Sequence, residues 1–126
     1  MTQQALILFA HGARAASWAA PFERLRELTR VRLPAVRVEL AFLELMTPQL
    51  PSLVAELAAA GIADITVVPV FLGQGGHVLR DLPLMIDQLR IDYPQLRLNV
   101  VEAAGENAAV LGALSDYCVS ALGAGV

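Results

Sequence analysis

The residues from Ile65 to His77, ITVVPVFLGQGGH, contain the clearest strand signal in the chain. Their first eight positions form an almost continuous apolar run, which is typical of a strand buried on both faces of a sheet. The run then breaks into a glycine-rich segment, so we expect the strand to end in a loop near Leu72. A second apolar run, from Ala5 to Ala10, ends just as abruptly at His11. These two runs are the predicted central strands.

The remaining segments complete an alternating pattern of strands and helices. Residues 36–43 and 96–100 alternate apolar and polar side chains, the period of a strand with one exposed face. Four segments have apolar residues at helical spacing: residues 17–31, 50–57, 82–93 and 110–121. We expect the second of these helices to start at Thr47 and Pro48, and the third at Asp81 and Pro83. The order β-α-β-α-β-α-β-α predicts an α/β fold with one four-stranded parallel sheet and helices on both faces.

The strand compositions also predict the order of the strands. Continuous apolar strands belong in the centre of such a sheet, and alternating strands belong at its edges. The expected order is therefore 2-1-3-4, a flavodoxin-like half, with residues 1–126 forming a single domain. Pro69 conflicts with this assignment, because a central strand normally excludes proline. The two halves of the chain are weakly similar, since each has an apolar strand that ends at a histidine-bearing loop, with His11 in the first half and His77 in the second. This similarity alone is too weak to define a repeat.

Composition excludes several classes of function. The 126 residues are 56% hydrophobic and only 17% charged, which favours a packed domain over a disordered chain. A net charge of −3 argues against a nucleic-acid binder. No apolar run approaches the ~18 residues of a membrane span, and no secretory signal is recognisable, so we expect a cytoplasmic protein without membrane contact. The single cysteine, Cys118, excludes an internal disulfide and a cysteine metal cage.

The chain has only two histidines, and both follow the predicted central strands. Ligands of open α/β sheets bind outside the carboxyl ends of the strands, where the winding direction reverses. In a 2-1-3-4 sheet this point lies between strands 1 and 3, so His11 and His77 should meet there, with Glu44 from the loop after strand 2 within reach. A lone histidine after a strand is more often an ordinary loop residue, so the prediction rests on the joint placement. Two imidazoles and a carboxylate suit iron, cobalt or nickel.

Three segments together resemble the small class II chelatases, the sirohydrochlorin chelatases of the CbiX and SirB type. They are LFAHGAR at residues 8–14, FLELMTP at residues 42–48, and VVPVFL at residues 67–72 leading into GGHVLRDLP at residues 75–83. The resemblance extends in matching order over essentially the whole chain, and the third segment is its most specific part. One mild departure is Ala13, where the family often has serine. Many residue types can hold that turn, so the departure puts little in doubt.

The resemblance implies a lyase that inserts Co²⁺, Fe²⁺ or Ni²⁺ into sirohydrochlorin, on the way to cobalamin, siroheme or a nickel tetrapyrrole. The metal is then a substrate, and no permanently bound cofactor is expected. By position, His11 and His77 match the metal-binding histidines of the family, and His11 matches its proton acceptor. The tetrapyrrole-contacting segment corresponds to Leu72, Gly73, Gln74, Gly75 and Gly76. Glu44 is a further candidate metal ligand, and Thr47 a further candidate for substrate contact.

The residue types fit this chemistry. Metalation removes two protons from pyrrole nitrogens, and a histidine side chain can accept a proton or bind a metal at neutral pH. Arg14 and Arg80 flank the histidines and are candidates for pairing with the peripheral carboxylates of the substrate. Larger chelatases of this type resemble two fused copies of such a unit. A chain with one copy is therefore expected to form a homodimer.

Three alternatives compete with this interpretation. A histidine phosphatase needs an arginine beside its nucleophilic histidine, and position 10 is Ala10. A dinucleotide-binding loop needs glycine at the sixth position of G-x-G-x-x-G, and the segment starting at Gly73 has Val78 there. A non-catalytic carrier of metal or tetrapyrrole on the same fold stays open, because it needs the same ligands and pocket. An assay of turnover separates a carrier from an enzyme.

Overall fold

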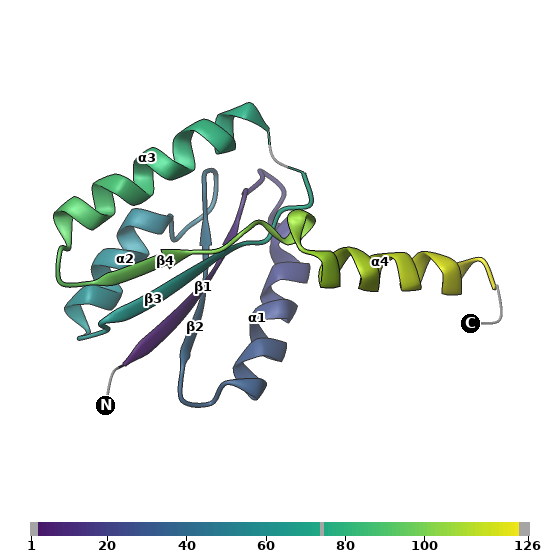
Figure 1. The fold of residues 1–126 in the computed structure, drawn as a ribbon, viewed down its shortest axis with the longest axis horizontal. Helices are drawn as coiled ribbons and strands as arrows, with labels where there is room; N and C mark the ends of the chain where they lie inside the picture. The colour runs from purple at the N-terminus through teal and green to yellow at the C-terminus, as the bar shows by residue number, and fades with distance from the viewer. Residues whose placement is uncertain (1–2, 74, 124–126) are drawn as a thin grey trace.

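The computed structural model describes residues 3–73 and 75–123, without the side chains of His77 and Leu79. Four strands alternate with four α-helices (Figure 1). They are β1 (Gln4–Ala10), α1 (Ala20–Arg32), β2 (Arg37–Phe42), α2 (Leu50–Ala59), β3 (Asp64–Pro69), α3 (Gly76–Asp92), β4 (Arg97–Val100) and α4 (Ala108–Ala121). Two short 3-10 helices, η1 (Ala16–Ala19) and η2 (Ala104–Glu106), precede α1 and α4.

The sheet is parallel throughout and has the order β2-β1-β3-β4, which confirms the predicted fold and strand order. Pro69 is accommodated because it is the last residue of β3. The ladder to β4 ends at the pair Val67 and Val100, and one further bond joins the Val101 amide to the Val67 carbonyl at 3.1 Å. The backbone groups of Pro69 point toward β4, as those of Val67 do, but Pro69 lies beyond the last hydrogen bond to that strand. The missing N–H of proline therefore removes no hydrogen bond from the sheet.

The two faces of the sheet are covered unequally. On one face α2 and α3 pack side by side on buried strand residues such as Ile7, Phe9 and Val67. On the other face α1 packs on β1 and β2, where Leu8 and Leu40 form a smaller cluster. This arrangement follows from right-handed crossovers. The connection from β1 to β2 runs toward one edge of the sheet, whereas those from β2 to β3 and from β3 to β4 run toward the other edge, so their helices lie on opposite faces.

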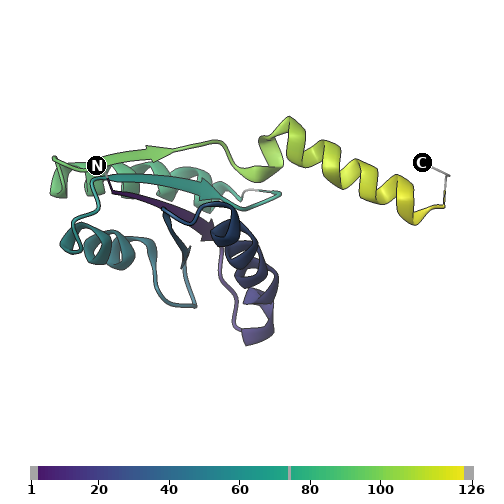
Figure 2. The ribbon, with the colours of Figure 1, turned by 90° about the horizontal axis from the view of Figure 1, so that it is seen from below.

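The last helix, α4, lies apart from both layers. None of its side chains is buried. In both views it extends away from the sheet and from the other helices, beyond the carboxyl ends of the strands (Figures 1 and 2). A helix was expected at residues 110–121 and is present, but it covers neither face of its own sheet. No helix within the described ranges is long and apolar enough to cross a membrane.

Two predicted helix starts are wrong. The chain does not enter α2 at Thr47 and Pro48, because the Pro48 carbonyl accepts a hydrogen bond from the Phe42 amide at 2.9 Å and stays beside the end of β2. The helix begins at Leu50 instead. Similarly, α3 begins at Gly76, five residues before the expected Asp81, and contains Pro83 in its interior.

Candidate functional site

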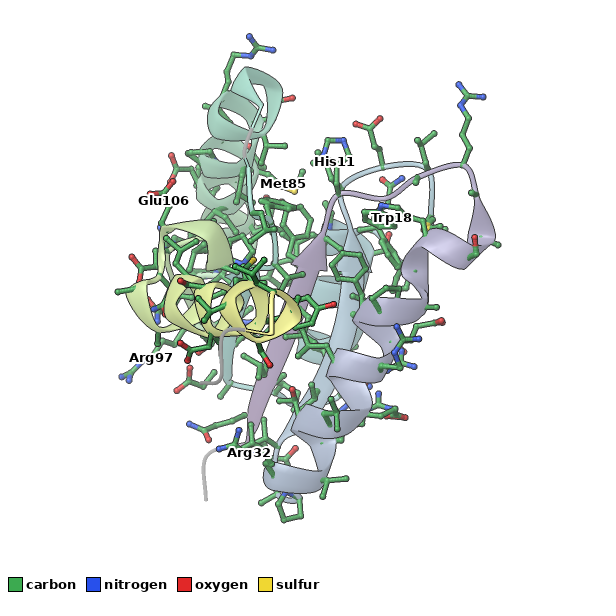
Figure 3. The ribbon with its side chains drawn as sticks, turned by 90° about the vertical axis from the view of Figure 1, so that its right-hand side faces the viewer. His11, Trp18, Arg32, Met85, Arg97 and Glu106 are labelled. Carbon is green, nitrogen blue, oxygen red and sulfur yellow. The ribbon has the colours of Figure 1, made fainter. Side chains whose placement is uncertain are left out.

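His11 follows β1 directly and lies at the carboxyl edge of the sheet, where Figure 3 labels it. Sheet-like hydrogen bonding continues one step past the strand ends. The Leu43 amide donates to the Ala10 carbonyl at 2.9 Å, and the Glu44 amide donates to the His11 carbonyl at 3.1 Å. These two bonds place the loop after β2 beside the loop after β1. Glu44 therefore lies next to His11, as expected from the sequence.

Gly12 makes this close approach possible. Its φ is +98°, in the left-handed region, and a Cβ atom built on it would lie 1.8 Å from the Glu44 carbonyl oxygen. No other residue can occupy this position without moving one of the two loops. The glycine of the His-Gly pair thus fixes the spacing between His11 and Glu44.

The side chains of this pair face each other and are open to solvent. The His11 Nε2 atom lies 3.6 Å from Glu44 Oε1, and the two side chains are 45% and 42% exposed. This distance is too long for a good hydrogen bond. Two ligands of one divalent ion at about 2.1 Å each lie roughly 3–3.5 Å apart. The pair is therefore spaced so that a small adjustment would let both atoms hold one ion.

The loop after β3 reaches the same edge through Phe71. The Phe71 ring is buried and packs edge-on against the His11 ring, with centroids 6.5 Å apart, and also against Phe9 at 5.8 Å. The Gly105 amide of η2 donates to the Phe71 carbonyl at 2.8 Å. A Cβ atom on Gly105 would lie 1.8 Å from the Leu72 carbonyl oxygen, so only glycine permits this contact. Sequence reasoning missed the roles of Phe71 and Gly105, since neither contact has a local signature.

The other predicted site residues have various positions around this edge. Gly75 is the N-cap of α3, Gly76 is its first residue, and the backbone of His77 lies in its first turn. The following residues are exposed: Leu72 and Gly73 after β3, Arg14 after β1, Thr47 after β2, and Arg80 on α3, whose Nε lies 3.4 Å from Asp81 Oδ1. Gln74 and the His77 side chain lie outside the described residues.

Of the three predicted metal ligands, the structure therefore brings together His11 and Glu44. Within the described residues, no three His, Cys, Asp or Glu side chains form a cluster that could hold a metal ion. The three-ligand set that includes His77 stays a prediction.

Comparison with known proteins identifies the family. A family model described as CbiX matches residues 5–120. The chain belongs to the CbiX family. The family inferred from the three sequence motifs is thus confirmed.

The relatives of this chain include proteins named sirohydrochlorin cobaltochelatase. The sirohydrochlorin cobaltochelatase of Methanopyrus kandleri is 35% identical over 82 residues, which are 65% of this chain and 57% of that protein. The sirohydrochlorin cobaltochelatase of Methanocaldococcus jannaschii is 34% identical over 83 residues, 66% of this chain and 58% of that protein. The chain thus spans less than two thirds of the length of these curated relatives.

Solved CbiX-type structures share the fold. A protein from Marinobacter aquaeolei VT8, described as a cobalamin (vitamin B12) biosynthesis CbiX protein, superposes with a TM-score of 0.82 and 32% identity over 94% of this chain and 97% of its own. The sirohydrochlorin chelatase SirB from Bacillus subtilis subspecies spizizenii, in complex with cobalt, has a TM-score of 0.72 and 25% identity. That match covers 82% of this chain but 44% of SirB.

Proposed function

We propose that this protein inserts Co²⁺, or alternatively Fe²⁺ or Ni²⁺, into sirohydrochlorin or a closely similar tetrapyrrole. The observation that carries the proposal is the exposed His11–Glu44 pair, held at 3.6 Å at the carboxyl edge of a CbiX fold. Two relatives named sirohydrochlorin cobaltochelatase, and a cobalt complex of a related chelatase, support the choice of metal and macrocycle.

The pair is suited to hand over a metal ion and take up a proton. The incoming ion binds to His11 Nε2 and a Glu44 oxygen, which are borderline and hard ligands suited to cobalt or iron. As the ion moves into the macrocycle, two pyrrole N–H bonds break and two metal–nitrogen bonds replace them. The Nε2 lone pair, free once the metal leaves it, accepts one proton. The second proton passes to Glu44 or directly to water, since both side chains are open to solvent.

The loops around the pair are suited to a flat substrate with acidic edges. Leu45 after β2 and Leu72 after β3 expose 53% and 63% of their surfaces on the two loops that flank His11. Apolar side chains in this position can contact the faces of a macrocycle. We assign the peripheral carboxylates to Arg14, to Arg80 and to backbone N–H groups at the N-terminus of α3, where glycine allows close approach.

We further propose His77 as a third metal ligand, because its backbone lies in the first turn of α3, directly after the loop that follows β3. A site of imidazole and carboxylate without thiolate suits transient binding, as a metal that is a substrate requires. The expected homodimer and the expected cytoplasmic setting are also proposals.

Turnover separates this function from a metal or tetrapyrrole carrier on the same fold. The protein is mixed anaerobically with a tenfold excess of sirohydrochlorin and Co²⁺, and the visible absorbance of the metalated product is followed. A chelatase produces many equivalents of product above the spontaneous rate. A carrier binds one equivalent and leaves the spontaneous rate unchanged, which would overturn the proposal.

A further inference from the structure

The register of the sheet places Phe71 directly beside His11. The pairing of β1 with β3 sets Phe9 opposite Pro69. Two residues further along each chain, His11 is opposite Phe71. The Val70 amide donates to the Phe9 carbonyl at 2.9 Å, so the pairing continues to the last residue before Phe71. Partners in a parallel pair lie on the same face of the sheet, and Phe71 belongs to the buried cluster on the face that α2 and α3 cover.

The Phe71 side chain is fixed by its surroundings, whereas the His11 side chain is open to solvent. Phe71 is buried and packs on Phe9, with the ring centroids 5.8 Å apart at an interplanar angle of 64°. The His11 ring meets Phe71 at 6.5 Å and 67°. Both contacts are edge-on and lie within the range of about 4.5–7 Å in which aromatic rings attract each other. The buried ring thus supports the exposed ring from one side.

Hydrogen bonds within the protein do not fix the orientation of this imidazole. A histidine that binds a metal usually donates its second ring N–H to a carbonyl or a carboxylate, which holds the ring in place. Among the described residues, neither ring nitrogen of His11 makes a hydrogen bond, and Glu44 Oε1 lies 3.6 Å from Nε2. Packing against Phe71 is therefore the contact that holds the His11 ring toward Glu44.

Phe71 is itself held in place by η2, the short helix after β4. The Gly105 amide of η2 donates to the Phe71 carbonyl at 2.8 Å. The next peptide group is also in contact, because a Cβ atom on Gly105 would lie 1.8 Å from the Leu72 carbonyl oxygen and 2.6 Å from its carbonyl carbon. These two contacts fasten the backbone of residues 71 and 72. A side chain at position 105 would displace the loop after β3 and the Phe71 ring with it.

We propose that Phe71 is a positioning residue of the metal site, which keeps the His11 ring turned toward Glu44, and that Gly105 holds Phe71 in that position. The inference rests on the proposed function, because the ion shared by His11 and Glu44 is the ion to be inserted. Phe71 offers no ligand atom and acts through His11. A ring that is already oriented loses little freedom when the ion binds, so the site binds the ion more tightly.

Substitution of the two paired phenylalanines separates positioning from packing. Phe71→Leu and Phe9→Leu each remove one ring of the same buried pair and leave an apolar side chain, so both should lower the urea midpoint. Of the two rings, Phe71 is the one in contact with His11. Calorimetric titration with Co²⁺ alone should show about tenfold weaker binding by Phe71→Leu, the lower end of the effect of groups that orient a metal ligand. Phe9→Leu should bind Co²⁺ as wild type does.

Nuclear magnetic resonance of the metal-free protein tests the contact itself. The chain has only two histidines, so the ring protons of His11 are assigned by their loss in His11→Ala. Wild type should show a nuclear Overhauser effect between the rings of His11 and Phe71. Gly105→Ala should weaken both this effect and the affinity for Co²⁺, since the added methyl group displaces the loop. Gly112→Ala is the control and should retain both, because no atom lies within 4 Å of its Cβ position.

Failure of the positioning role and failure of the proposed function give different results. Unchanged Co²⁺ affinity in Phe71→Leu, or equal weakening by Phe9→Leu, would overturn the positioning role and leave the proposed function standing. Absence of the Overhauser effect in wild type would do the same. A Gly105→Ala variant that keeps both the effect and the affinity would overturn the role of Gly105. A wild type that binds no Co²⁺ would overturn the proposed function, and the positioning role with it.

Discussion

Gly12 is the residue on which the geometry of the candidate site depends most. It combines a φ of +98° with a Cβ position 1.8 Å from the Glu44 carbonyl oxygen. Gly61 has a similar φ of +87°, but no atom lies within 4 Å of its Cβ position. The two glycines therefore allow the cost of backbone conformation to be separated from the cost of a steric clash.

We expect Gly12→Ala to lower the free energy of unfolding by about 3 kcal/mol or more, since the clash adds to the conformational cost. Gly61→Ala should cost only about 1–2 kcal/mol, the conformational term alone. Urea denaturation of both variants measures the difference. Equal losses in the two variants would show that the loops do not meet as closely as described.

Glu44→Gln keeps the size of the side chain but removes its charge. If Glu44 and His11 share the incoming ion, the variant should bind Co²⁺ about tenfold more weakly, because an amide is a poorer ligand than a carboxylate. Calorimetric titration with Co²⁺ measures the dissociation constant. Glu56→Gln, on the exposed side of α2, is the control and should match wild type. An unchanged constant in Glu44→Gln would remove Glu44 from the site.

Residue types at strand ends were enough to predict that His11 and Glu44 meet, because parallel strands deliver their carboxyl ends to one edge of the sheet. The roles of Phe71 and Gly105 were not predictable. Their contacts join segments far apart in the chain, and an isolated glycine gives no sign of what approaches it. The third predicted ligand, His77, stays a prediction.

Among the structural elements, the edge strands β2 and β4 are each protected by an arginine from the preceding helix. Arg90 Nη2 and Nε donate to the Leu98 carbonyl at 2.8 and 3.2 Å, and Arg30 Nε donates to the Val38 carbonyl at 2.9 Å. Such contacts occupy backbone groups that would otherwise be free to pair with another chain.

Arg90→Ala should lower the free energy of unfolding by about 1–2 kcal/mol, since a charged donor is removed from a partly buried carbonyl. Hydrogen exchange of the β4 amides should accelerate more than that of the β2 amides. Arg24→Ala, an exposed position on α1, is the control and should change stability by less than about 0.5 kcal/mol. Uniform acceleration across both strands would argue against a local role for Arg90.

Helix boundaries were the weakest part of the sequence prediction. Thr47 and Pro48 have the residue types of a helix start, but the hydrogen bond from Phe42 to Pro48 keeps them beside β2. Asp81 and Pro83 gave a similar false signal, and the glycines at 75 and 76 begin the helix instead. At Thr47 and Pro48 a tertiary contact overrides local propensity.

At the scale of the whole molecule, strand composition was sufficient to predict the 2-1-3-4 order, because the two central strands have nearly continuous apolar runs and the other two alternate apolar and polar side chains. The direction of α4 was not predictable. An apolar helix face specifies that it will be covered, but nothing in its own sequence says whether the covering surface belongs to the same chain.

The proposed function requires His11 to take part in metal insertion. The most direct test follows the visible absorbance of anaerobic sirohydrochlorin with Co²⁺, comparing wild type, His11→Ala and a reaction without protein. We expect wild type to accelerate metalation with repeated turnover, and His11→Ala to fall to the protein-free rate while its circular dichroism stays that of the folded chain. Wild-type turnover in His11→Ala, or no acceleration by wild type with cobalt, iron or nickel, would contradict the claim.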